Sequence, residues 1–281
     1  MNFFKESCLE CPRVKAVHNF KLLDELPDIK DKNVFSFVRE DCNYTYFHWL
    51  FESFYSLLTF KDKEKIDYYY MPSRCSCNAV HYSCSLNSFV HHSLYLTGIS
   101  PEKMIDSNTF PDVVPNIKAQ IKSCWNPSSE VISLIKSSLC KNIPEDKYIK
   151  SKKIYISRED AIFKRISNEK EVTAYLSNKG FETITLSSLT LSEQIQLFRS
   201  ASIVIGAHGA GLTNIMFCKP HTLVLEIFKS TGDVYKLIAS ECNLQYTHIS
   251  INDLYRKFSE PLSIELLDET LKNYSNRSIK I

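Results

Sequence analysis

Glycine is scarce in this chain, and long apolar runs are absent. The 281 residues include six glycines, whereas an average chain of this length would carry about 20. No run of 18 apolar residues occurs, which argues against a membrane-spanning helix, and residues 1–6 lack the apolar core of a signal peptide. We therefore expect a cytoplasmic protein with no membrane span.

Neither sign of charge dominates the composition. The chain has 34 lysines and arginines against 32 aspartates and glutamates, a formal net charge of +2. No basic stripe stands out, so we do not expect a nucleic acid as a partner. The hydrophobic content of 44% over 281 residues is enough for one large or two small domains with real cores. Nothing in the sequence points to an oligomeric state.

Several motifs of metal and nucleophile chemistry are also missing. No Asp-x-Asp flanks a predicted strand, the nearest approach being Asp62-Lys63-Glu64, and no Gly-x-Ser-x-Gly elbow occurs. The ten cysteines follow no disulfide rhythm, and the groups Cys8/Cys11 and Cys75/Cys77/Cys84 do not complete a clear four-ligand zinc set. We predict that the protein holds no metal.

Half of the scarce glycines fall in one segment. Three of the six lie within residues 206–211 in the spacing G-x-x-G-x-G, which is neither the dinucleotide fingerprint nor a Walker A loop. Ile203–Ile205 before it reads as a buried parallel strand, and Leu212–Cys218 after it as the start of a helix. Such a strand, turn and helix N-terminus favour an anion site. The alternative is a turn that only permits close packing, which His208 and Asn214 make less attractive.

Strand and helix patterns alternate through the second half of the chain. Two segments, Asn168-x-x-Glu171 and Thr190-x-x-Glu193, read as capping boxes that open helices. This alternation predicts a parallel sheet covered on both faces. The predicted strands are 153–157, 183–186, 203–205, 222–228 and 247–251, with helices over 168–179, 190–201 and 234–242.

The first half is less regular. Its patterns predict strands at 34–38 and 67–71 and helices at 47–60 and 87–97. The charged stretch 141–153 reads as a linker, and 261–272 reads as a terminal helix. We therefore expect two α/β lobes with a cleft between them, and ligands at the carboxyl ends of the strands.

Three charged residues of the second half are candidates for a binding site at that edge. Arg158 directly follows a predicted strand, and Arg165 lies a few residues further on. An arginine offers a forked donor suited to phosphate, although a surface salt bridge with Glu159 or Asp160 is the alternative. Glu226 lies near the end of its strand, where an acidic residue often holds a ribose.

One aromatic run of the first half carries a possible acid–base pair. His48 and Glu52 are four residues apart in Tyr46-Phe-His-Trp-Leu-Phe-Glu, so they share one face of a helix. Such a pair can form a general base with its orienting group. An ordinary i,i+4 pair on a half-buried helix is the alternative, and the second histidine of a zinc peptidase motif is absent.

Together these segments resemble glycosyltransferase family 61. The match runs from Ser157 to Phe228 and includes the string His-Gly-Ala-Gly-Leu-Thr-Asn at 208–214. The His48 to Glu52 run resembles the family's first-half motif less closely. The remaining matching segments are Arg165-Ile-Ser-Asn-Glu, Leu191-Ser-Glu-Gln-Ile and Leu225-Glu-Ile-Phe.

The resemblance implies a GT-B architecture of two Rossmann-like lobes with parallel sheets and a cleft between them. It divides the chain into an acceptor-side lobe 1–145, a nucleotide-sugar-binding lobe 146–260 and a C-terminal helix and tail 261–281. It also implies inverting, metal-independent transfer from a UDP-sugar to a glycan hydroxyl. UDP-xylose is the first expectation for the donor and UDP-N-acetylglucosamine the second, since the family includes plant N-glycan xylosyltransferases and animal N-acetylglucosaminyltransferases.

The resemblance also assigns residues to roles. His48 and Glu52 become the catalytic pair, with either one as the base. The donor-binding residues become Arg158, Arg165, His208, Gly209, Ala210, Gly211, Thr213, Asn214 and Glu226. The chain is short for this family and lacks its usual anchor, so we expect a microbial or viral version acting in the cytosol.

Two other classes of function compete with this reading. A Rossmann-type oxidoreductase or methyltransferase would need a G-x-G-x-x-G after the first strand of a lobe, which is missing. A non-catalytic carbohydrate- or nucleotide-binding protein on a decayed transferase fold fits the short first half. Retention of both the second-half segments and the His48/Glu52 pair argues against decay.

Overall fold

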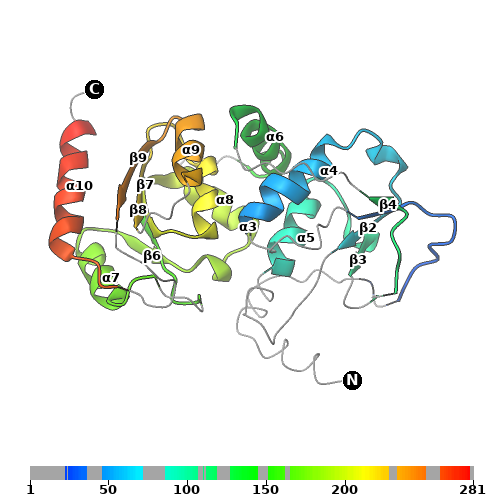
Figure 1. The fold of residues 1–281 in the computed structure, drawn as a ribbon, viewed down its shortest axis with the longest axis horizontal. Helices are drawn as coiled ribbons and strands as arrows, with labels where there is room; N and C mark the ends of the chain where they lie inside the picture. Colours follow the sequence, from blue (N-terminus) through cyan, green and yellow to red (C-terminus); the bar gives the residue numbers. More distant parts are fainter. Residues whose placement is uncertain are drawn as a thin grey trace, which may run out of the picture. The chain divides into compact units, whose positions relative to one another are not determined.

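A computed structural model describes most of the chain and divides it into two compact units. The first contains Met1–Lys147 together with Ser187–Leu197, and the second contains Tyr148–Leu186 together with Phe198–Ile281 (Figure 1). The predicted lobe boundary at 145/146 stays a prediction. The structure describes residues 23, 25–36, 46–71, 86–106, 110, 112–118, 127–144, 151–161, 165–227, 233–250 and 260–278.

The first unit contains a four-stranded sheet whose described strands are all parallel. The strands lie in the order β3-β2-β1-β4. Their bounds are β1 Val34–Ser36, β2 Tyr68–Met71, β3 Met104–Asp106 and β4 Ile117–Lys118.

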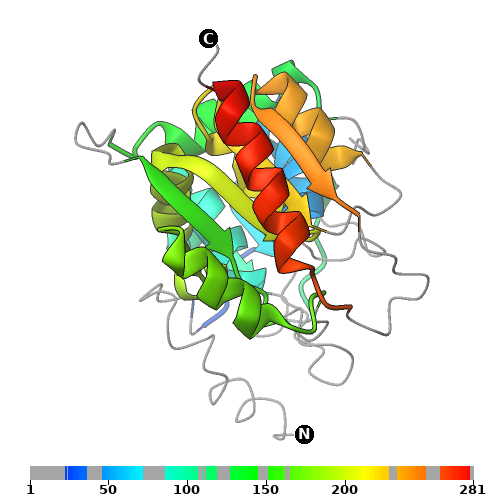
Figure 2. The ribbon, with the colours of Figure 1, turned by 90° about the vertical axis from the view of Figure 1, so that its left-hand side faces the viewer.

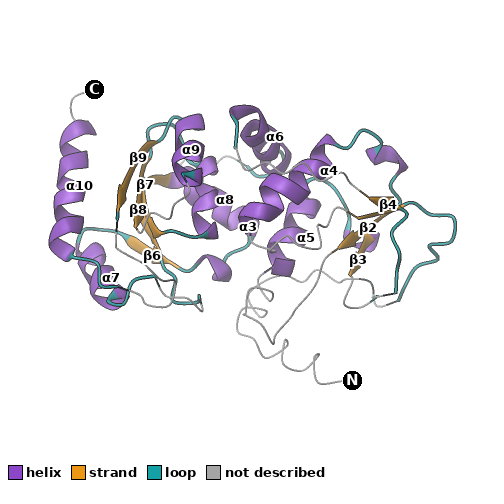
Figure 3. Cartoon of the chain, in the orientation of Figure 1, coloured by secondary structure: helices purple, strands orange, loops and turns teal. Residues whose placement is uncertain are grey.

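The described helices between β1 and β3 lie in the connections of this sheet, and one further helix follows β4 (Figure 3). One face of the sheet carries a small apolar cluster of Val34, Ile105 and Val113. The alternate residue Phe35 is fully buried, and its ring lies 4.8 Å from that of Phe60. The helical segments are α3 Tyr46–His48, η1 Trp49–Phe54, α4 Tyr55–Thr59, η2 Lys63–Lys65, α5 Leu86–Leu96, η3 Pro101–Lys103 and α6 Ser129–Cys140.

Helix α8 (Leu191–Ser200) begins with the predicted capping box. The Thr190 N–H donates to Glu193 Oε2 at 2.7 Å, and the Glu193 N–H donates to Thr190 Oγ1 at 3.1 Å. The buried side chain of His92 on α5 adds a further contact, since its Nδ1 accepts from the Leu191 N–H at 3.2 Å. Its Nε2 lies 3.0 Å from Ser192 Oγ. His92 is therefore a packing residue that joins α5 to the first residues of α8.

The second unit is built on a five-stranded sheet in the order β6-β5-β7-β8-β9, and all four pairings are parallel. Its inner strands include largely apolar runs, as expected for a parallel sheet covered on both faces. Every residue of one such run, Leu223–Ile227, is buried. The strands are β5 Lys152–Ile156, β6 Glu182–Ile184, β7 Ala201–Ala207, β8 Leu223–Ile227 and β9 Gln245–Ile249. The other elements are α7 Glu169–Asn178, η4 Leu186–Ser188, η5 Ala210–Phe217, α9 Val234–Glu241 and α10 Ile264–Ser278.

Helices α7 and α10 cover one face of this sheet (Figure 2). Buried residues from both helices, such as Leu176 and Leu267, join one core cluster with Tyr155, Ile205 and Leu225 of the central strands. Side chains alternate along a strand, so Gly206 and Glu226 face the opposite side of the sheet. The 3₁₀-helix η5 lies on that side, where Leu212 contacts Gly206.

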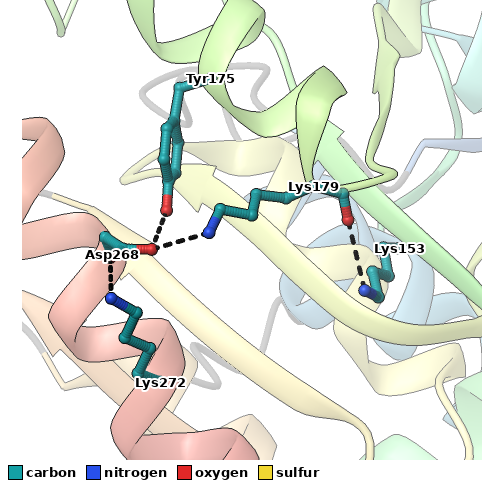
Figure 4. Close-up of polar contacts among 5 residues, drawn as sticks. All are labelled: Lys153, Tyr175, Lys179, Asp268 and Lys272. Atoms are coloured by element: carbon teal, nitrogen blue, oxygen red, sulfur yellow. Dashed lines mark hydrogen bonds and ion pairs between the residues drawn. The ribbon is translucent and has the colours of Figure 1, made fainter.

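A polar cluster fixes the C-terminal helix α10 to α7 (Figure 4). Asp268 accepts a short hydrogen bond from the Tyr175 hydroxyl and pairs with Lys179 at 3.0 Å and Lys272 at 2.5 Å. Lys153 Nζ donates to the Lys179 carbonyl at 3.3 Å and so joins β5 to the end of α7. Hydrogen bonds from Lys272, Tyr175 and Lys179 hold the pKa of the Asp268 carboxyl well below its usual range.

We expect Asp268→Asn to lower the thermal midpoint of the protein at neutral pH. Because the carboxyl pKa is lower in the folded than in the unfolded state, its contribution is complete above the unfolded value of about 4 and is lost as the pH falls below it. Melting curves from pH 7 down to 3 should therefore show the gap to the wild type narrowing in acid. The matched control is Glu182→Gln, which breaks an exposed pair with Lys152 and should change little. A pH-independent gap would contradict the electrostatic origin.

The predicted α/β class with parallel sheets is confirmed, and several details differ. The prediction of a capping box at Asn168 is wrong. Helix α7 does begin after Asn168, but that side chain makes no cap. Instead, its Nδ2 donates to the Leu262 carbonyl, and its Oδ1 accepts from the Leu262 N–H. Strands β3 and β4 and helix α6 were not predicted. The predicted residues 37–38, 228, 251 and 145–150, and cysteines 8, 11, 75, 77 and 84, lie outside the described residues.

Candidate functional site

The strand order places a topological switch point between β5 and β7. Counted within the second unit, the order is 2-1-3-4-5, the doubly wound arrangement in which the chain leaves the first strand in one direction and later returns on its other side. Ligands of such sheets bind outside the carboxyl ends of the two strands at this point. Here those ends are Ile156, followed by Ser157 and Arg158, and Ala207, followed by His208 and Gly209.

One carboxylate organises the loop after β5. Oε1 of Glu169, the first residue of α7, accepts from the Tyr155 hydroxyl at 3.1 Å, the Ser157 hydroxyl at 3.0 Å and the Arg158 N–H at 2.9 Å. Burial, with Glu169 beside it, raises the pKa of Tyr155 above its ordinary value, so the phenol stays a neutral donor. Glu169 therefore fixes where the backbone of Arg158 leaves the strand. The sequence reasoning missed this residue.

The glycines of the turn meet two different packing requirements. A Cβ on Gly206 would lie 3.3 Å from Ile156 Cβ and from Leu212 Cδ2, so this glycine lets β5 and η5 pack closely. A Cβ on Gly209 would overlap the guanidinium of Arg158. The backbone of Gly209 is extended, with φ 165°, so the requirement there is space for the arginine and not a special conformation. Gly211 is closely approached by Leu186.

The predicted helix after the turn is present, and it is a 3₁₀-helix. It is η5, Ala210–Phe217, and its residues from Leu212 onward are buried. Thr213 and Asn214 are fully buried, whereas Ala210 and Gly211 are half-buried at its first turn. Residues 209–211 are therefore more exposed than Thr213 and Asn214, which follow them in η5.

Glu226 lies in β8 with both carboxylate oxygens bonded inside the protein. Its side chain is 1% exposed. Oε1 lies 2.5 Å from Nδ1 of His208, and Oε2 accepts from the Tyr246 hydroxyl at 2.5 Å. Burial and the Glu226 carboxylate raise the pKa of Tyr246 above its ordinary value. A ribose at Glu226 would have to share these oxygens, so the predicted ribose contact stays a prediction.

A second tyrosine, Tyr235, lies near His208 and within electrostatic range of Arg158 and Arg165. The Tyr235 ring of α9 lies edge-on to the ring of His208 at 5.2 Å. Burial and Glu226 raise the pKa of Tyr235, while the charges of Arg158 and Arg165 act on it in the opposite direction. Both guanidiniums therefore lie within electrostatic range of one phenol. Sequence reasoning found the arginines and missed Tyr235 and Tyr246.

The first unit holds the His48/Glu52 pair on an irregular helix. His48 ends α3, and Glu52 lies in the π-helix η1, a form often found at functional sites. Their Nδ1 and Oε1 atoms are 3.0 Å apart. The Glu52 side chain is 1% exposed and that of His48 is 23% exposed. The histidine is thus the member that faces outward, and the carboxylate supports it from inside.

Metal-ligating side chains do not gather in the part of the chain that the structure describes. Among the residues that the structure describes, no group of three or more His, Cys, Asp or Glu side chains could hold a metal ion. No described helix is both long and apolar enough to cross a bilayer. Metal independence and a cytoplasmic location stay predictions.

The doubly wound sheet, with an arginine and a glycine turn at its switch point, defines an α/β protein of the kind that binds ligands at this edge. Residues 46–225, more than half of the chain, match glycosyltransferase family 61, and the chain belongs to that family. It is 31% identical over 129 residues to the β-1,2-xylosyltransferase RCN11 of Oryza sativa subsp. japonica and 34% identical over 91 residues to a β-1,2-xylosyltransferase of Arabidopsis thaliana. These alignments cover 39% and 31% of the chain but 24% and 16% of the two relatives.

Proposed function

We propose that this protein is an inverting, metal-independent glycosyltransferase that moves a sugar from a UDP-sugar to a hydroxyl of a glycan acceptor. The observation that carries the proposal is the meeting of Arg158 with the 208–211 turn at the switch point, in a chain of family 61. We further propose that the two α/β units are the lobes of a GT-B enzyme. Xylose is the first sugar to test because both relatives carry that name.

The donor diphosphate is assigned to the edge of the second unit. Arg158 offers a forked, permanently charged donor, and the backbone N–H groups at 209–211 lie beside it at the start of η5. Arg165 adds a second positive charge near the same place. These charges offset the negative charge that develops on the leaving UDP, the role that a metal has in other transferases. Thr213 and Asn214, both fully buried, follow the turn in η5.

The acceptor base is assigned to His48, with Glu52 as its orienting carboxylate. If the proton of the neutral ring is on Nδ1 and is donated to Glu52, Nε2 is the nitrogen that would take the proton of the acceptor. In the proposed step the acceptor hydroxyl oxygen attacks the anomeric carbon from the face opposite UDP. Its proton passes to His48 Nε2, the bond between the anomeric carbon and the phosphate oxygen breaks, and UDP leaves with the electron pair. A single displacement of this kind inverts the anomeric centre.

The proposal is tested by UDP release from a panel of UDP-sugars, with and without EDTA. We expect slow hydrolysis of one donor, unchanged by EDTA. Release that EDTA abolishes would refute metal independence. UDP binding without release from any donor, even with glycan acceptors present, would favour a non-catalytic binding protein. Tight binding of NAD or S-adenosylmethionine with none of UDP would refute the proposal.

We expect Gly209→Ala to weaken UDP binding with little loss of stability. The new methyl group would displace the Arg158 guanidinium, while the extended backbone accepts alanine without strain. Loss of one charged hydrogen bond corresponds to about tenfold or more in affinity. Calorimetry measures the affinity and thermal melting measures the stability.

The matched control is Gly180→Ala, another glycine-to-alanine change in the second unit. Gly180 has φ +81°, with nothing near its missing Cβ. This variant should lose about 1–2 kcal/mol of stability because alanine disfavours that backbone, and it should bind UDP normally. Equal UDP binding by the wild type and Gly209→Ala would argue against Arg158 as the phosphate ligand.

A further inference from the structure

We propose that Glu169 is a positioning residue of the donor site, which holds Arg158 so that its side chain, and not the backbone of its loop, binds the diphosphate. The proposal rests on the assignment of UDP to this edge of the second unit. It adds the residue that aims the phosphate ligand before the nucleotide arrives, and this residue does not itself touch UDP.

The backbone N–H groups of the loop after β5 already have partners inside the protein. The Arg158 N–H donates to Glu169 Oε1 at 2.9 Å, and the Glu159 N–H donates to the Ser157 hydroxyl oxygen at 3.0 Å. The Ala161 N–H donates to the Arg158 carbonyl at 2.9 Å. In other doubly wound sheets, N–H groups after the first strand hold the phosphate. In this loop they are engaged, so the Arg158 side chain is the suitable phosphate ligand.

The Glu169 carboxylate joins the end of β5 to that loop. Its Oε1 accepts from the Ser157 hydroxyl at 3.0 Å and from the Tyr155 hydroxyl at 3.1 Å, as well as from the Arg158 N–H. The Tyr155 phenol remains a donor because burial raises its pKa. Two side chains of the strand end therefore fix the oxygen that holds Arg158. Loss of the carboxylate would release the arginine backbone from the strand.

The start of α7 gives Glu169 a rigid base. The Ser167 N–H donates to the Glu260 carbonyl at 3.0 Å. The Asn168 side chain forms two hydrogen bonds with the backbone of Leu262, a buried residue of the core cluster. The two residues before Glu169 are thus fixed to the segment that leads into α10. A side chain can position its partner accurately only when its own element is held in this way.

The far end of the Arg158 side chain is held as well. Its Nε is buried, and its guanidinium occupies the space that a Cβ on Gly209 would need. The side chain thus reaches from the end of β5 to the end of β7, so a shift of its backbone would move the guanidinium off Gly209. A long side chain that is ordered before binding loses less entropy when the ligand arrives. Glu169 would therefore act on UDP affinity through Arg158.

The test is a double-mutant cycle in the full-length protein, with UDP affinity measured by calorimetry. We expect Glu169→Ala to weaken UDP binding by about 3- to 10-fold, the effect of ordering one long side chain at binding instead of before it. In an Arg158→Ala background the same change should have no further effect, because the residue that it positions is missing. A purely structural role of Glu169 would weaken binding by the same factor in both backgrounds.

Two further variants complete the cycle. Glu169→Asp keeps the carboxylate but is one methylene too short to join all three donors, so it should show the same pattern with a smaller loss. It replaces Glu169→Ala if the alanine variant does not fold. The matched control is Glu171→Ala, which removes an exposed carboxylate from the same turn of α7, one that bonds Asn168. UDP affinity should be unchanged in this control.

The outcomes separate this proposal from the donor assignment. A wild type that binds no UDP, or an Arg158→Ala protein that binds UDP as well as the wild type, overturns both. If the folded Glu169 variant binds UDP like the wild type, or loses affinity equally in both backgrounds, the positioning role alone is overturned.

Discussion

Replacing Arg158 with alanine is expected to weaken UDP binding by about 10- to 150-fold, the range for losing a hydrogen bond to a charged group. The guanidinium lies against Gly209, and its backbone is fixed by the Glu169 carboxylate. The loss should therefore come from the missing side chain and not from movement of the loop. Isothermal titration with UDP measures the affinity.

Arg158→Lys is the informative companion variant. It keeps the positive charge and loses the planar fork, so an intermediate affinity is expected. Both variants should keep the melting temperature of the wild type within a few degrees, because the arginine is only partly buried. Unchanged UDP binding in a folded Arg158→Ala protein would remove this residue from the donor site.

The second large effect is expected at the pair in the first unit. His48→Ala should lower kcat by roughly 10² to 10⁴, the usual contribution of a general base, and should leave UDP affinity unchanged. Glu52→Gln keeps the size of a side chain that is 1% exposed and removes its negative charge. Its turnover should fall because the His48 ring loses the carboxylate that orients it.

The two variants also distinguish the two possible bases. If Glu52 itself took the proton, Glu52→Gln would abolish turnover, and His48→Ala would keep most of it. Full transfer activity in both variants would show that the base lies elsewhere. UDP release with a saturating donor and acceptor measures the turnover of both variants.

The core of the second unit was predictable because its signals are local. Strands β5, β7 and β8 are apolar runs long enough to recognise, and the Thr190 capping box depends on residues three apart. The same holds for the glycine turn, where the sequence located the site and its arginine. The described parts of strands β3 and β4 contain three and two residues, and an alternating pattern cannot be recognised in segments of that length.

The parts of the site that were missed depend on contacts distant in sequence. Tyr246 reaches Glu226 from a neighbouring strand, and the predicted start of that strand at Thr247 left the tyrosine outside it. An alternation counted from Gln245 would have placed Tyr246 and His248 on one face with Glu226. The Asn168 box failed because Leu262, 94 residues away, offers that side chain two backbone partners. The sequence pattern predicts a helix that includes Trp49–Phe54, but it does not distinguish a π-helix from an α-helix there.

The first unit contains two stretches that are separated in sequence, and this separation affects when the unit can fold during synthesis. Its second stretch is Ser187–Leu197. There the Leu191 N–H donates a hydrogen bond to His92, which lies 99 residues earlier in the chain. A chain leaving the ribosome from its N-terminus releases residues 148–186 of the second unit before this segment. The first unit can therefore complete its folding only during synthesis of the second. A fragment ending at Lys147 would lack the partners that α8 gives to His92, and we expect it to require chaperones or to aggregate.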